Sequence, residues 1–144
     1  MALKTSDTTT LTGSLPAPLE QVFALLTDPA KMPQWLAGCR AVAPLGPVKK
    51  GTRLKIEFAR GTTEFLITDL VPPHVFGWTE QGTRQGSKIL FNLEFAGSTT
   101  TVTLRHTWTP HTLRAWFLGS LLRRRSARRV FDTAIVELRR LLGK

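Results

Sequence analysis

The sequence predicts a single α+β domain in which a curved antiparallel sheet of about six to seven strands wraps around a long C-terminal helix. Three observations support this fold class. Apolar residues recur with helical spacing between residues 121 and 142, period-two alternation runs through residues 41–109, and short turns containing Gly or Pro interrupt that alternation. Strands joined by short turns form a meander, and only the last helix is long enough to cover its apolar face.

The length and composition fit one globular domain spanning residues 1–144. A domain of this size buries roughly 70% of its unfolded surface, so it folds without structural metals or disulfides. Cys39 is the only cysteine, which excludes an internal disulfide and makes a reducing, cytoplasmic location the expected one. Residues 1–12 lack the apolar run of a signal peptide, and no segment reaches the roughly 20 apolar residues of a membrane span.

The N-terminal third is expected to form one strand and two short helices. Residues 8–15 are rich in threonine and alternate in character, which favours a strand. Within residues 19–26, apolar side chains follow the i, i+3, i+4, i+7 spacing of a helix stripe, and the preceding Pro18 suits the start of a helix. The Asp28-Pro29 pair supplies a favourable N-cap and first residue for a second helix, which is expected to end near Gly38.

Six further strands are predicted from the alternation. They occupy residues 41–45, 53–58, 64–71, 74–80, 88–95 and 99–109. Gly97-Ser98 is typical of a tight hairpin turn between the last two strands. The sheet is expected to end at Pro110, residues 111–119 to form a short helix or an ordered loop, and residues 121–142 to form the long helix, with Gly143 as its C-cap.

The order of these elements and several local strings resemble the SRPBCC superfamily, also called START-like or helix-grip proteins, and within it the polyketide cyclase/dehydrase-like branch. The strings that carry the resemblance are residues 15–29, Trp35, Pro72-Pro73, Phe76-Gly77-Trp78 and Thr107-Trp108-Thr109. The resemblance implies a cavity between the sheet and the long helix that holds hydrophobic molecules such as lipids, sterols, polyketides or plant hormones. Carriers, sensors and aromatase/cyclases share this fold, so the fold alone does not choose among them.

A ligand cavity is expected on the concave face of the sheet, because the sheet curls more widely than one helix fills. Such cavities are mostly apolar and contain a few placed polar groups. The inward-facing strand residues are expected to be Leu54, Ile56, Phe58, Phe76, Trp78, Phe91, Leu93, Phe95, Val102, Leu104, His106 and Trp108. The candidate ligand-binding residues are Trp35, Phe58, Phe76, Trp78, Phe91, Leu93, His106, Trp108, Trp116, Val130, Ala134 and Leu138. Ordinary core packing explains each of them as well.

His106 is the candidate polar group in an otherwise apolar inward row of the last strand. A buried imidazole can orient a ligand hydroxyl or carbonyl, act as a general base together with Asp69 or Glu80, or be a hydrogen-bonded core residue. A slip of one residue in the strand register would instead point Arg105 into the pocket, as an anion anchor.

Two functions of the cavity remain open at this stage. The scarcity of convergent acid and base groups favours non-catalytic binding of a lipid, a polyketide or an aromatic-like molecule, and an enzyme of polyketide cyclase, aromatase or dehydratase type that uses His106 is the alternative. Cys39 beside Arg40 is a weak candidate for a nucleophile with a mildly lowered pKa. The oligomeric state, monomer or dimer, is also open.

Neither a metal nor a cofactor is expected. The three histidines of the chain are not spaced as a ligand set, and a single cysteine is too few for a structural zinc site. The sequence also contains no glycine-rich phosphate loop and no other nucleotide motif.

Positive charge is concentrated at the C-terminal end. The chain has a net charge of +10, and residues 114–144 contain nine basic and two acidic side chains. The candidates for an anionic partner are Arg123, Arg124, Arg125, Arg128 and Arg129. Arginines at the start of a helix oppose its macrodipole, which suggests a role beyond stability. An anionic membrane or nucleic acid would suit them, although no nucleic-acid-binding fold accompanies the cluster and a solvated helix face is the simpler interpretation.

Overall fold

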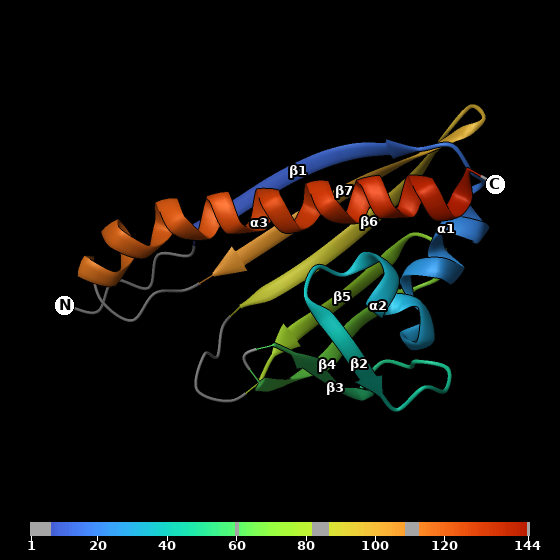
Figure 1. Ribbon diagram of the computed structural model, residues 1–144. Coiled ribbons are helices and arrows are strands. Elements are labelled where there is room, and N and C mark those ends of the chain that lie inside the picture. Colours follow the sequence, from blue (N-terminus) through green and yellow to red (C-terminus); the bar gives the residue numbers. More distant parts are fainter. Residues whose placement is uncertain (1–6, 60, 82–86, 109–112, 144) are drawn as a thin grey trace.

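The computed structural model describes the backbone of residues 7–59, 61–81, 87–108 and 113–143, and the side chains of residues 8–59, 61–81, 87–107 and 128–143. Figure 1 shows the helix α3 lying along one face of the sheet. The elements in chain order are β1 (Asp7–Leu15), α1 (Leu19–Leu26), η1 (Pro29–Lys31), α2 (Met32–Trp35), β2 (Cys39–Ala43), β3 (Arg53–Phe58), β4 (Gly61–Val71), β5 (Val75–Glu80), β6 (Lys88–Ala96), β7 (Thr99–Trp108) and α3 (Leu113–Leu142).

Seven antiparallel strands form one sheet in the order β1-β7-β6-β5-β4-β3-β2. Strands β2 to β7 follow one another as a meander, and β1 adds to the outer edge of β7. The predicted fold class, an α+β domain with a helix packed on an antiparallel sheet and two short helices after the first strand, is confirmed. Short turns cause this topology, since sequential strands joined by few residues pair with each other.

The two short helices form as the local sequence predicts. All of the apolar stripe of α1 is buried, and the Thr27 hydroxyl donates a hydrogen bond of 2.8 Å to the Phe23 carbonyl oxygen at the end of the helix. The Asp28 carboxylate then accepts a hydrogen bond of 3.1 Å from the Ala30 backbone N–H, so it caps η1 as expected. The second helix is a 3₁₀ turn followed by the single α-helical turn α2.

Burial along the strands decides the register that the sequence left open. In β7, Val102, Leu104 and His106 are buried, whereas Arg105 is exposed. His106 lies opposite Ile89 of β6 on one side and Thr9 of β1 on the other. The histidine therefore points toward the core, and the alternative in which Arg105 enters the pocket is wrong.

Two expectations about the ends of elements are wrong. Phe95 was expected on the covered face but is 60% exposed, because it lies next to the Gly97-Ser98 turn in a hairpin that projects beyond the rest of the sheet (Figure 1). The long helix was expected to begin at residue 121 but begins at Leu113. Gly119 costs a helix about 1 kcal/mol relative to Ala, and the turns on both sides of it outweigh that cost.

α3 packs closely on the sheet at Gly13, where β1 has no side chain. A Cβ atom built on Gly13 would lie 3.1 Å from both the Cγ1 and the Cδ1 atoms of Ile135 and 3.4 Å from the Phe131 ring. Ala134 and Leu138 of the same helix half are buried against the core. The absence of a side chain at Gly13 therefore allows the C-terminal half of α3 to pack directly on the strand.

We expect Gly13→Ala to lower the free energy of unfolding by about 1–3 kcal/mol, because the added methyl group overpacks this contact. Urea unfolding measures the effect. Gly46→Ala is the matched control, since a Cβ at Gly46 has no neighbour within 4 Å. An equal loss in both variants, or none in Gly13→Ala, would contradict the packing argument.

Candidate functional site

A cavity of about 220 Å³ lies between the sheet and α3. Its walls come from the segment after α2, from β3 to β7 and from α3. The lining residues are Leu36, Ala37, Phe58, Phe65, Trp78, Glu80, Ser87, Ile89, Leu104, His106 and Val130. Eight of these eleven side chains are apolar or aromatic, so most of the wall offers only dispersion contacts to a guest.

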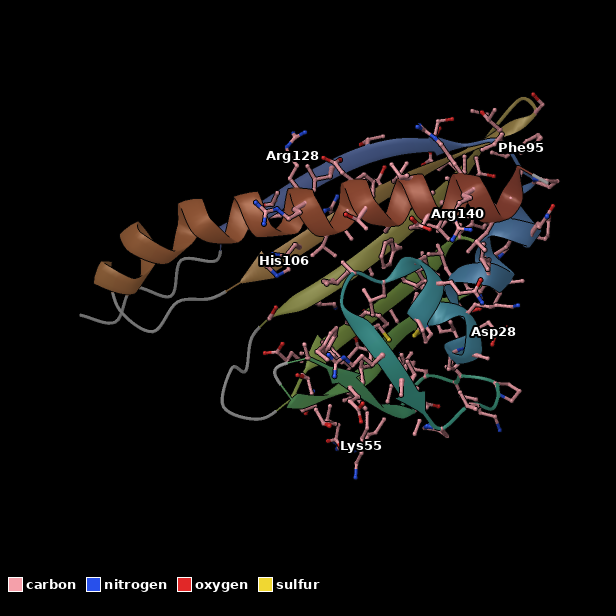
Figure 2. The ribbon with its side chains drawn as sticks, viewed as in Figure 1. Asp28, Lys55, Phe95, His106, Arg128 and Arg140 are labelled. Atoms are coloured by element: carbon pink, nitrogen blue, oxygen red, sulfur yellow. The ribbon has the colours of Figure 1, made fainter. Side chains whose placement is uncertain are left out.

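The three polar side chains of the cavity come from β5, from the residue before β6 and from β7. The Ser87 hydroxyl and the Nε2 atom of His106 are 3.1 Å apart and form a hydrogen bond, and both residues are less than 10% exposed. Figure 2 shows His106 beneath α3. The backbone N–H of Glu80 donates to the Ser87 carbonyl oxygen at 2.9 Å, which holds the ends of β5 and β6 together. Glu80, Ser87 and His106 are named the polar wall below.

Trp78 forms the aromatic part of the cavity wall. Its ring lies 5.1 Å from the Phe65 ring and 5.3 Å from the Phe76 ring, measured between centroids. The indole N–H of Trp78 is buried and has no hydrogen-bond partner among the described residues, as is also true of Trp35. A buried donor without a partner costs about 1–3 kcal/mol, so an acceptor at Trp78 would stabilise the protein.

Comparison with known proteins identifies the family of the chain. The sequence matches the protein family described as "Polyketide cyclase / dehydrase and lipid transport" over residues 7–143. The chain belongs to this family. The resemblance inferred from the sequence strings is thus confirmed at the level of the family. No curated protein matches the chain.

Several solved structures share the fold of this polyketide cyclase/lipid transport family member. DynU16, from the dynemicin biosynthetic locus, has 19% identity and a TM-score of 0.67, with 96% of this chain and 48% of that chain covered, so this chain spans about half of DynU16. The Aha1 dimer from Colwellia psychrerythraea has 21% identity and a TM-score of 0.71, covering 92% and 96% of the two chains.

A third similar structure is the Polyketide_cyc-like protein Cgl2372 from Corynebacterium glutamicum. It has 22% identity and a TM-score of 0.65, and the alignment covers 98% of this chain and 94% of that protein. Identities this low show a common fold and carry no information about a common ligand.

The structure divides the predicted ligand-binding residues of this family member into two groups. Phe58, Trp78, His106 and Val130 line the cavity. The others with described side chains belong to the buried core and do not line it: Trp35, Phe76, Phe91, Leu93, Ala134 and Leu138. The side chains of Trp108 and Trp116 lie outside the described residues.

Trp35 packs against one half of the concave face, so the side chains there belong to the buried core and do not line the cavity. It reaches from α2 to the sheet and packs edge-to-face on Phe91, with ring centroids 6.1 Å apart, and Phe91 stacks on Phe76 at 6.2 Å. This aromatic cluster fills the space under one part of the sheet.

The sequence prediction missed Leu36, Ala37, Phe65, Ser87 and Ile89 as lining residues. Ser87 has a usable signal, since it extends the inward row of β6 by two residues from Ile89.

Asp69 does not belong to the site, although the sequence analysis offered it as a partner for His106. A β-bulge between Ile67 and Asp69 shifts the register, and Asp69 lies opposite Gly77, between the inward-facing Phe76 and Trp78. The bulge therefore turns Asp69 to the outer face. There its carboxylate lies 2.9 Å from the Nζ atom of Lys88, and the hydrogen bond from Lys88 lowers the pKa of Asp69.

One further chemical expectation concerns Cys39. Burial raises the pKa of the Cys39 thiol, so the expectation of a lowered pKa beside Arg40 is wrong. Within the described ranges, no three His, Cys, Asp or Glu side chains come together as a metal site. None of the helices described has the length and apolar character needed to cross a bilayer.

We expect Asp69→Asn to lower the free energy of unfolding by less than about 1 kcal/mol at neutral pH, because the ion pair is partly exposed. A lowered folded-state pKa stabilises the fold above the unfolded pKa of about 3.9, and this contribution disappears as the pH falls through the folded pKa. Urea unfolding of both proteins at neutral and acid pH tests this. Lys88→Gln should behave in the same way. A difference that persists when the carboxylate is protonated would contradict the assignment.

Proposed function

We propose that this protein binds a compact hydrophobic molecule in the cavity between the sheet and α3. The observation that carries the proposal is a cavity of about 220 Å³ whose wall is apolar except at one side. An apolar cavity of about 150 Å³ stays dry and takes up benzene. The volume here therefore suits one or two fused rings or an apolar chain of similar size, and it is below the ~300–1,000 Å³ of drug-sized sites.

The polar wall supports a ligand that has an oxygen atom at one end. Ser87 has one hydroxyl donor and can accept from His106, so it can donate to a ligand carbonyl while the imidazole holds it in place. A polar side chain on an otherwise apolar wall offers an oxygen-bearing guest a directed contact that a hydrocarbon cannot use. The preferred guest is therefore an aromatic or alicyclic compound with a hydroxyl or carbonyl group, rather than a hydrocarbon.

We expect Val130→Phe to weaken the binding of β-naphthol by more than about tenfold, because the larger side chain occupies the volume of the guest. β-Naphthol is fluorescent and has two fused rings and one hydroxyl, so titration by fluorescence measures its affinity directly. Val136→Phe is the matched control on the same helix, since Val136 is 59% exposed on the outer face.

Naphthalene separates the two parts of the proposal, because it has the rings of β-naphthol without the hydroxyl. Weaker binding of naphthalene than of β-naphthol supports the role of the polar wall. Unchanged affinity in Val130→Phe, or no binding of either probe to the unmodified protein, would refute binding in this cavity.

A second candidate function is proton-transfer chemistry of the cyclase or dehydratase type. It is favoured by one observation, the hydrogen bond of 3.1 Å that fixes the His106 ring at the cavity. In this function, an imidazole nitrogen takes a proton from the carbon next to a ketone, the resulting enolate oxygen accepts a hydrogen bond from Ser87, and the imidazolium returns the proton. Glu80 lies at the same wall, whereas Asp69 does not.

The test uses acetophenone in heavy water, where exchange of the methyl protons reports enolate formation by NMR. If His106 is the base, we expect His106→Asn to lower the exchange rate by about 10²–10⁴-fold. β-Naphthol should still bind to that variant, although more weakly, because the apolar wall that contacts its rings is unchanged. Exchange at the background rate with the unmodified protein would eliminate this function and leave ligand binding intact.

A further inference from the structure

Two arginines on the outer face of α3 have no ion-pair partner among the side chains that the structure describes. Arg128 and Arg129 are exposed, and among the described residues neither takes part in an ion pair. Arg140 differs, since it pairs with Glu137 at 2.6 Å, and the Nε atom of Arg139 donates to the Ser14 carbonyl oxygen of β1 at 3.1 Å. Arg128 and Arg129 are therefore available to a partner, and they are named the arginine pair below.

The charge around the arginine pair is larger than the pair itself. Residues 114–144 contain nine basic and two acidic side chains, and the net charge of the whole chain is +10. The backbone of Arg123, Arg124 and Arg125 belongs to the same continuous helix, while their side chains lie outside the described residues. Because α3 begins at Leu113, these arginines are in the middle of the helix, so the earlier argument from an unfavourable macrodipole does not apply. The positive charge of this segment indicates an anionic partner.

We infer that the outer face of α3 docks on an anionic phospholipid bilayer. Two observations favour a bilayer over nucleic acid. Val136 lies on this face and is 59% exposed, and an apolar side chain among arginines suits the boundary between headgroups and acyl chains. Val130, two residues after Arg128, lines the cavity from the opposite side of the helix. An α-helix is only about 10–12 Å across, so docking brings the cavity wall next to the phase in which an apolar ligand dissolves.

The argument from the cavity rests on the proposed ligand binding, whereas the charges of the arginine pair attract an anionic bilayer even when the cavity is empty. The probes are vesicles of phosphatidylcholine with phosphatidylserine, compared with vesicles of phosphatidylcholine alone. We expect the protein to co-sediment with the anionic vesicles and to be released as the salt concentration rises. The double variant Arg128→Gln/Arg129→Gln should bind the anionic vesicles about ten- to thirtyfold more weakly.

The controls separate local charge from total charge. Lys49→Gln/Lys55→Gln removes the same charge from exposed positions, and Figure 2 shows Lys55 at the far side of the molecule from Arg128. This control should bind like the unmodified protein. Arg128→Lys/Arg129→Lys should also retain binding, because attraction to an anionic bilayer depends on the positive charge and not on the shape of the guanidinium group. β-Naphthol binding should not change in any of these variants.

Three outcomes would overturn the inference. The first is no binding to anionic vesicles at low salt. The second is an equal loss in the two Gln double variants, which would mean that only the total charge matters. The third is tight binding to duplex DNA under conditions where the vesicles are not bound, which would assign the arginine pair to nucleic acid.

Discussion

The contact between α3 and the backbone of β1 at Gly13 is the constraint on which the rest of the structure depends. Ile135 and Phe131 approach the strand closely there because no side chain intervenes. A helix is stiff over a few turns, so this contact at its C-terminal half sets the distance between helix and sheet farther along. Val130 lies more than one turn before Ile135 and faces open volume instead of the strand. The cavity is thus a consequence of where the helix is anchored.

One half of the concave face of the sheet is covered by packed side chains, and the other half borders the cavity. Trp35 of α2 fills one half by packing on Phe91, while the other half ends at Trp78 and the polar wall. A single long helix cannot fill a sheet of seven strands, and the short helices complete only the part that they reach. The position of α2, fixed by the Asp28 cap before it, therefore decides how much volume remains for a guest.

The sequence predicts well which face of the sheet a strand residue occupies. It predicts poorly which other elements pack on that residue. Alternation placed His106 inward and Arg105 outward, because the side-chain period of a strand is independent of what packs on it. Asp69 was misplaced since a bulge reverses the alternation without a mark in the sequence. Phe76 and Trp78 belong to the same inward row, yet only Trp78 lines the cavity. That difference depends on where α2 and α3 lie. The local sequence of β5 does not determine such long-range packing.

α3 connects the cavity and the proposed docking surface, since Val130 borders the cavity while Arg128 and Arg129 face outward two residues and one residue earlier. The helical period makes this arrangement possible: neighbouring positions lie on different sides, so one segment serves two surfaces without conflict. The chemistry of the two sides is independent, because exposed charges a helix diameter from the cavity are screened by solvent. A ligand that dissolves in a bilayer and a helix that is attracted to its surface would meet at the same place, and transfer would then require no exposure of the ligand to water.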